Sequence, residues 1–222
     1  MTICLVTDRR RLGAALGIGP ADWIPLLERQ VVAAAESGVD LVQIREPDLD
    51  SRTLFGLLSR LVASCRKTGT RLLLNERVDI ALAAGASGVH LRETSLSCQA
   101  ARRLAPAGFL IGRSIHRAGP IAAHSGADYL IAGTVCSSPS KPGATLLGWE
   151  GLSAVVAAAA GKPVLGIGGL DLPSIPLLAG CGVSGLAAIG AFIPSAGEDI
   201  HVFVQKRVIE MRLAFDSRRS VP

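Results

Sequence analysis

The residues best suited to chemistry are polar side chains that interrupt short apolar runs. His116 follows Ser114 just after one run, and an imidazole can accept and return a proton near neutral pH. Gly168 and Gly169 follow another run and Gly190 follows a third, and glycines let backbone N–H groups approach a phosphate. We therefore expect a proton-transfer group and a phosphate site. The alternatives are a purely structural histidine and glycines that only form tight turns.

Two further positions of this kind could hold anions. Arg45 ends an apolar run and could clamp a phosphate or carboxylate, or it could pair only with Glu46 or Glu76. The segment 137–143 (SSPSKPG) is rich in hydroxyls and contains Lys141, so it could close over an anion or be an ordinary surface loop.

These residues need a scaffold that brings distant loops together. Eight apolar runs do not alternate with polar residues, so each is predicted to be a strand buried on both faces. They are residues 3–6, 39–44, 72–74, 88–91, 109–111, 129–132, 164–167 and 186–189. Stretches with helical spacing lie between and after them: 23–37, 52–67, 78–84, 97–104, 118–125, 150–160, 173–181 and 202–215. Glycines that follow several of these stretches are typical of helix caps.

The repeat of helix, glycine cap and buried strand predicts an α/β protein with a single (β/α)8 TIM barrel over residues 1–215 and a flexible tail over 216–222. An open doubly wound sheet is the alternative, but the glycine-rich motif expected after its first strand is missing. Residues 7–11 (TDRRR) stand there instead. In a barrel, the polar residues described above would gather at the carboxyl ends of the strands, where barrel enzymes hold their active sites.

Composition excludes several classes of protein. The chain has 222 residues, 49% of them hydrophobic, and its 23 basic and 18 acidic residues give a net charge of +5. With only 4% aromatic residues and dispersed charge, a nucleic-acid partner is not expected. The arginine runs 9–11 and 218–219 are interpreted as solvated surface. The longest wholly apolar run, 154–160, is far shorter than the roughly 20 residues that cross a membrane, so we expect a soluble cytoplasmic protein.

The cysteines do not predict a disulfide or zinc site. There are five, an odd number, and they lie far apart in the sequence. Cys136 stands beside the serine-rich segment, but no activating base is apparent, and we interpret it as a small apolar filler.

Six segments, in order, resemble the thiamine phosphate synthase/TenI family: 42–46 (VQIRE), 74–81 (LNERVDIA), 88–91 (GVHL), 111–116 (IGRSIH), 138–142 (SPSKP) and 167–170 (IGGL). The resemblance spans nearly the whole barrel and implies a (β/α)8 fold, a site for a thiazole phosphate and usually a homodimer. It also implies three groups of site residues. These are Gln43, Arg45, Asn75 and Ser114 at the pyrimidine and diphosphate; Ser138, Ser140 and Lys141 in an anion-binding loop; and Gly168, Gly169, Ile189 and Gly190 around the thiazole phosphate.

The family has two branches with different chemistry. The synthase joins a pyrimidine diphosphate to thiazole phosphate with loss of pyrophosphate. The TenI branch is a thiazole tautomerase that moves a proton so that the thiazole carboxylate phosphate becomes aromatic. The segment 112–116 (GRSIH) is similar to the TenI pattern, in which the histidine is thought to move the proton, and this implies a catalytic role for His116.

Three departures from the synthase pattern favour the tautomerase. Glu76 replaces an aspartate, Pro47 replaces a basic residue, and Ser95, in the stretch 92–95 (RETS), replaces an aspartate that helps to hold magnesium. Because release of pyrophosphate requires cationic stabilisation and a proton shift does not, we predict a metal-independent thiazole tautomerase without a cofactor. One alternative is a thiamine phosphate synthase with Mg²⁺ on Glu76 and perhaps Glu93; the other is a non-catalytic binder of thiazole or thiamine phosphate.

Overall fold

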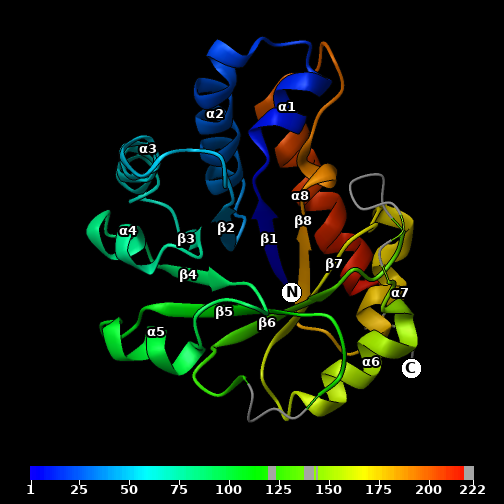
Figure 1. Cartoon of the computed structure of the whole chain (residues 1–222). Helices are drawn as coiled ribbons and strands as arrows, with labels where there is room; N and C mark the ends of the chain where they lie inside the picture. The colour runs from blue at the N-terminus through cyan, green and yellow to red at the C-terminus, as the bar shows by residue number, and fades with distance from the viewer. Residues whose placement is uncertain (120–123, 138–142, 144, 218–222) are drawn as a thin grey trace.

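Short aliphatic runs form eight parallel strands that close into a barrel in sequence order (Figure 1). The computed structural model describes residues 1–119, 124–137, 143 and 145–217. The strands are β1 (Thr2–Val6), β2 (Leu41–Ile44), β3 (Arg71–Asn75), β4 (Gly88–Leu91), β5 (Leu110–Ile115), β6 (Tyr129–Gly133), β7 (Val164–Ile167) and β8 (Gly185–Ala188). Parallel pairing of β8 with β1, in which Thr2 is opposite Gly185, closes the ring. The predicted (β/α)8 barrel is confirmed.

Helices surround the barrel and cover the outer faces of the strands (Figure 1). They are α1 (Arg9–Ala15), α2 (Trp23–Glu36), α3 (Ser51–Ser64), α4 (Val78–Ala83), α5 (Cys98–Leu104), α6 (Gly148–Ala158), α7 (Ile175–Gly180) and α8 (Ile200–Asp216). Side-chain caps define several starts: Asp50 accepts hydrogen bonds from the first turn of α3, and Asp199 does so for α8. The last helix ends one residue beyond the expected boundary at 215, and residues 218–222 of the expected tail lie outside the described residues.

The helices differ from the expectation at two places. Helix α1 was not predicted; it begins directly after β1 at Asp8, whose carboxylate caps it, and it packs against α2 through Leu12 and Gly13. A side chain at Gly13 would overlap the Trp23 ring, so glycine permits this close packing. The helix expected over 118–125 falls partly on residues 120–123, which are not described, and residues 118 and 119 are not helical.

The strands bury both faces, which explains their continuous apolar runs. Along β1, Ile3 and Leu5 belong to the large core between strands and helices, whereas Cys4 and Val6 belong to a smaller cluster with Tyr129 and other residues inside the barrel. The barrel is therefore a filled core that supports a site at one end. None of the helices in the described ranges is long and apolar enough to cross a membrane.

Candidate functional site

A cavity of about 620 Å³ opens at the carboxyl ends of the strands. Every strand supplies part of its wall: Val6, Gln43, Asn75, His90, Ser114, Ile131, Ile167 and Ala187 come from β1 to β8 in turn. The volume lies within the range of ligand pockets, and barrel enzymes place their chemistry at this end. The polar residues predicted from the strand ends are thus brought together in one place.

A glycine turn after β7 forms one side of the cavity. Gly168 and Gly169 have φ values of +102° and +62°, which side chains rarely allow. A Cβ atom on Gly169 would lie 2.3 Å from the carbonyl oxygen of Ser137, and one on Gly168 would lie 2.5 Å from Cγ2 of Thr134. The pair must therefore be glycine, and it packs directly against the residues that lead into segment 138–142.

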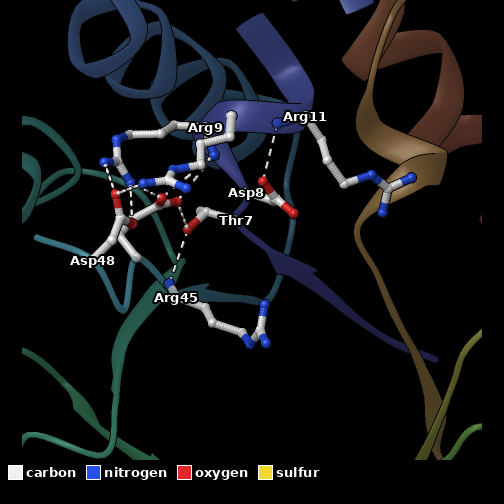
Figure 2. Close-up of polar contacts among 8 residues, drawn as sticks. Thr7, Asp8, Arg9, Arg11, Arg45 and Asp48 are labelled. Atoms are coloured by element: carbon white, nitrogen blue, oxygen red, sulfur yellow. Dashed lines mark hydrogen bonds and ion pairs between the residues drawn. The ribbon is translucent and has the colours of Figure 1, made fainter. Parts of the chain in front are cut away.

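Arg11 completes this side of the cavity. Its Nη2 atom lies 3.4 Å from the position that a Cβ of Gly190 would occupy, just after β8, where Ile189 also lines the cavity. Figure 2 shows the side chain extending from α1 toward that segment, while its backbone N–H donates to the Asp8 carboxylate at 3.0 Å. Within the described part of the chain the Arg11 guanidinium has no ion-pair partner, so it is available for an anion.

The interpretation of residues 9–11 as solvated surface is wrong for Arg9. This residue is buried and its Nη1 atom lies 2.7 Å from Oε2 of Glu46, while Nη2 lies 2.5 Å from Asp48 (Figure 2). Burial raises the pKa of Glu46, and the hydrogen bonds from Thr7 and Arg9 oppose that rise. The hydrogen bond from Arg9 holds the pKa of Asp48 far below its usual range. Arg9 is thus a structural residue beneath the rim.

Arg45 stays free because Glu46 is already occupied. Thr7 donates its hydroxyl to Oε1 of Glu46 at 2.7 Å and accepts the backbone N–H of Arg45 at 2.9 Å, which holds the end of β2 in place (Figure 2). The Arg45 guanidinium lines the cavity and forms no ion pair with any described residue. The alternative in which it pairs only with Glu46 or Glu76 is therefore wrong.

Gln43 and Asn75 form a polar patch beside Arg45. The Gln43 amide nitrogen donates to Oδ1 of Asn75 at 3.0 Å. This bond uses the acceptor of Asn75, so the amide nitrogen of Asn75 remains a donor on the cavity wall.

His90 lies deeper in the wall, between Tyr129 and Ser114. Its Nε2 atom is 2.8 Å from the Ser114 hydroxyl and its Nδ1 atom is 3.1 Å from the Tyr129 hydroxyl. Burial, and then the charge of Arg113, lower the pKa of His90 to about 3, so the ring is neutral near pH 7. His90 lines the cavity and holds Ser114, a predicted substrate contact.

His116 lies on the rim with one ring nitrogen committed. Its Nδ1 atom forms a hydrogen bond with the backbone carbonyl oxygen of Gly133. A carbonyl can only accept, so Nδ1 carries the proton and Nε2 of the neutral ring keeps its lone pair. The residue lines the cavity, so this nitrogen can act as a base toward a bound molecule.

Glu76, Arg92 and Ser95 form a compact cluster after β3 and β4. The Arg92 Nη2 atom lies 2.7 Å from Oε2 of Glu76, and the Ser95 hydroxyl donates to Oε1. Partial burial would raise the pKa of Glu76, but Arg92, Ser95 and the nearby charge of Arg45 lower it overall. Glu76 adopts a φ of +65°, which is uncommon for a residue other than glycine and is often seen at functional sites.

The magnesium site implied by the resemblance to the synthase does not fit this cluster. Mg²⁺ requires several hard oxygen ligands in octahedral geometry. Oε2 of Glu76 is in the ion pair with Arg92, Oε1 accepts from Ser95, which offers only a hydroxyl, and the guanidinium brings a positive charge to the position that a cation would need. Among the described residues, Glu93 included, no three His, Cys, Asp or Glu side chains are grouped so that they could hold a metal ion.

The predicted anion-binding residues Ser138, Ser140 and Lys141 lie outside the described residues. The sequence missed Arg11 and His90 as cavity residues. The signal for Arg11 was its position directly after β1, at the same end of the barrel as the other polar residues.

Comparisons with known proteins show the family to which the chain belongs. The family profile described as "Thiamine monophosphate synthase" matches residues 20–192. A protein of Geobacter sulfurreducens named "Putative thiamine-phosphate synthase" is 38% identical over 195 residues, covering 86% of each chain. A "Thiamine-phosphate synthase" of Caldanaerobacter subterraneus subsp. tengcongensis is 34% identical over 191 residues, covering 85% of this chain and 87% of the relative.

Solved structures include a "Thiamine phosphate pyrophosphorylase" from Pyrococcus furiosus, with a TM-score of 0.77, 27% identity and 96% of each chain covered. The matched region includes seven of the eight strands and every described cavity residue from β2 to β8. Of these three proteins, the two sequence relatives are named as thiamine-phosphate synthases and the solved structure as a thiamine phosphate pyrophosphorylase. Shared sequence over most of the chain, together with the shared barrel, places this protein in the thiamine monophosphate synthase family of enzymes.

Proposed function

We propose that this protein is a thiamine-phosphate synthase, which joins a pyrimidine diphosphate to a thiazole phosphate and releases pyrophosphate. The observation that carries the proposal is the 34–38% identity, over at least 85% of this chain, to relatives with that name. It favours the synthase over the tautomerase that the departures after β3 and β4 predict.

The cavity offers two separate regions for anions, as a reaction between two phosphorylated substrates requires. One region combines Gly168, Gly169 and Gly190 with Arg11 and suits a phosphate monoester. The other combines Arg45 and Arg92 with the Asn75 amide and suits a diphosphate. A tautomerase would need only one of these two regions for its single phosphorylated substrate.

The chemistry asks the protein to hold the substrates and to stabilise a leaving anion. The carbon–oxygen bond between the pyrimidine methylene and the diphosphate breaks, and its electron pair leaves with pyrophosphate. The thiazole nitrogen supplies the electron pair of the new carbon–nitrogen bond. The reaction needs no oxidant, so the residues act by orientation and charge, with Gln43 and Ser114 at the pyrimidine and Ser138, Ser140 and Lys141 as further anion contacts.

A direct assay tests this assignment. The purified chain is incubated with the pyrimidine diphosphate and the thiazole phosphate, and thiamine phosphate and pyrophosphate are quantified in parallel. We expect equal amounts of the two products, and we expect loss of turnover in Gly169→Ala because a Cβ there would collide with the Ser137 carbonyl. Failure to form thiamine phosphate at high concentrations of both substrates, with and without Mg²⁺, would refute the proposal.

A thiazole tautomerase is the second candidate because of His116. The bond from Nδ1 to the Gly133 carbonyl leaves Nε2 as a base at the cavity. If the protein catalyses aromatisation of the thiazole tautomer, we expect His116→Ala to lower kcat by about 10² to 10⁴-fold. If the wild type and His116→Ala aromatise the thiazole tautomer at the same rate, the tautomerase proposal fails and the protein would only bind the thiazole phosphate.

We also propose that the protein works as a homodimer. Helix α8 exposes Val202, Ile209 and Leu213, and such an apolar stripe is typical of an interaction surface. Light scattering that finds one 22.9 kDa chain per particle at micromolar concentration would contradict this.

A further inference from the structure

We propose that Arg92, held on Glu76, takes the place of a magnesium ion, so that the chain binds pyrophosphate and releases it without a divalent cation. The inference rests on the proposed synthase function for its catalytic part. Its binding part concerns only the cluster at the ends of β3 and β4 and can be tested alone.

The contacts of Glu76 place the guanidinium cation of Arg92 beside its carboxylate and leave donors on Arg92. One carboxylate oxygen lies 2.7 Å from Nη2 of Arg92 in an ion pair, and the other accepts from the Ser95 hydroxyl. A guanidinium carries five N–H donors, and among the described residues only Nη2 of Arg92 has a side-chain partner. The side chain is 62% exposed and lines the cavity, so its remaining donors can reach a bound diphosphate.

Replacing magnesium with Arg92 leaves the net charge of the cluster unchanged. The site implied by the resemblance has two carboxylates and one Mg²⁺, which sum to zero, and the pair in this chain has one carboxylate and one guanidinium, which also sum to zero. Ser95 removes one carboxylate and Arg92 supplies one positive charge, so the cluster stays neutral while it offers hydrogen bonds with defined directions. Arg45 adds a second, unpaired positive charge near Glu76.

The loop that carries Arg92 is held in place before any ligand binds. The Arg92 backbone N–H donates to the Ser95 hydroxyl at 3.0 Å, and the Ser95 N–H donates to the Arg92 carbonyl at 3.0 Å. The buried Arg113 guanidinium donates to the carbonyls of Glu93 and Leu96 at 2.6 and 2.7 Å. Groups fixed in advance stabilise developing charge without the cost of reorganisation.

Calorimetry with inorganic pyrophosphate in EDTA tests the binding part. We expect the wild type to bind and Arg92→Ala to bind about ten- to a hundredfold more weakly, as expected for the loss of charge-assisted hydrogen bonds. Arg66→Ala is the matched control, because Arg66 is exposed and lies between α3 and β3 at the opposite end of the barrel. The inference is overturned if the wild type binds pyrophosphate only with Mg²⁺, or if Arg92→Ala binds as tightly as the wild type.

Turnover measurements separate this inference from the proposed function. We expect wild-type turnover to be unchanged by EDTA or added Mg²⁺. Arg92→Ala should have low activity that Mg²⁺ partly restores, because Glu76 is then free, and Arg92→Ala/Ser95→Asp should respond more strongly. Wild-type turnover that appears only with Mg²⁺ overturns the inference and leaves the synthase assignment intact. Pyrophosphate binding in EDTA without turnover under any condition refutes the synthase and supports the anion site.

Discussion

Two arginine–carboxylate pairs lie at the same end of the barrel and differ in exposure. The side chains of Arg9 and Glu46 are 8% and 2% exposed, whereas those of Arg92 and Glu76 are 62% and 26% exposed. Around the buried pair, Asp48 and Thr7 complete the hydrogen bonds. Around the exposed pair, no other side chain in the described ranges contacts the Arg92 guanidinium, which lines the cavity. The same chemical pair is thus enclosed by the fold in one place and open to the cavity in the other, where we propose that it binds a diphosphate.

The largest effect on the free energy of unfolding is expected when the buried pair is broken. Arg9→Ala leaves the Glu46 carboxylate buried without its cation, so we expect a loss of about 3 to 5 kcal/mol in the free energy of unfolding. Urea denaturation measures it. Arg10→Ala is the control, because Arg10 shares the Asp48 partner at 2.7 Å but is exposed, and we expect a loss under about 1 kcal/mol.

The cause of that loss can be isolated with a second substitution. Glu46→Gln in the Arg9→Ala background removes the stranded charge, so we expect it to recover part of the stability. Equal stability of the single and double variants would show that lost packing, and not the unpaired charge, dominates.

An intermediate effect on the free energy of unfolding is expected from His90, which is buried like Arg9 and Glu46 but carries no charge near pH 7. Its pKa is about 3 in the folded protein and about 6.5 unfolded, so the unfolded chain binds more protons between these values. Stability from this residue is complete above the unfolded pKa and falls as the pH decreases toward the folded one. We expect a loss of about 2 kcal/mol from pH 7 to pH 5.

Urea midpoints at the two pH values measure this loss in the wild type and in His90→Gln. The variant should be less stable at pH 7 but should show a flatter pH dependence. An unchanged slope would mean that other groups cause the acid sensitivity.

The smallest effect on the free energy of unfolding is expected when the exposed pair is broken. Arg92→Ala should change the free energy of unfolding by less than about 1 kcal/mol, because the Arg92 side chain is 62% exposed and water can solvate Glu76 in its place. The same urea measurements check it. A loss comparable to that of Arg9→Ala would show that the Arg92–Glu76 pair holds its loop together and would remove the distinction between the two pairs.

The fold could be predicted because its signals are local. Buried apolar runs and the glycines between helix and strand recur in every unit, and strand ends in a parallel barrel must meet at one rim. Helix α1 and the role of Arg9 could not be predicted in this way. Glu46 is 37 residues from Arg9, so no local pattern distinguishes this arginine from its exposed neighbour Arg10.

The location of the candidate site could be predicted from the sequence, but the ion pair within it could not. Gln43, Asn75, Ser114 and the glycines lie in the cavity wall as expected. The ion pair of Glu76 with Arg92 was missed, although barrel order offered a signal: Asn75 pairs with His90 in the β3–β4 register, so the residues that follow both strands emerge side by side. The roles of these residues stay predictions for the assays above.

The turn at 92–95 closes on itself through two hydrogen bonds between its first and last residues. Arg113 of β5 supports it from below through the Glu93 carbonyl, a backbone atom that substitutions in the turn leave in place. If Arg92 replaces magnesium as proposed above, substitutions confined to these four residues and Glu76 would be enough to change whether the enzyme needs a dissolved metal, without altering the barrel.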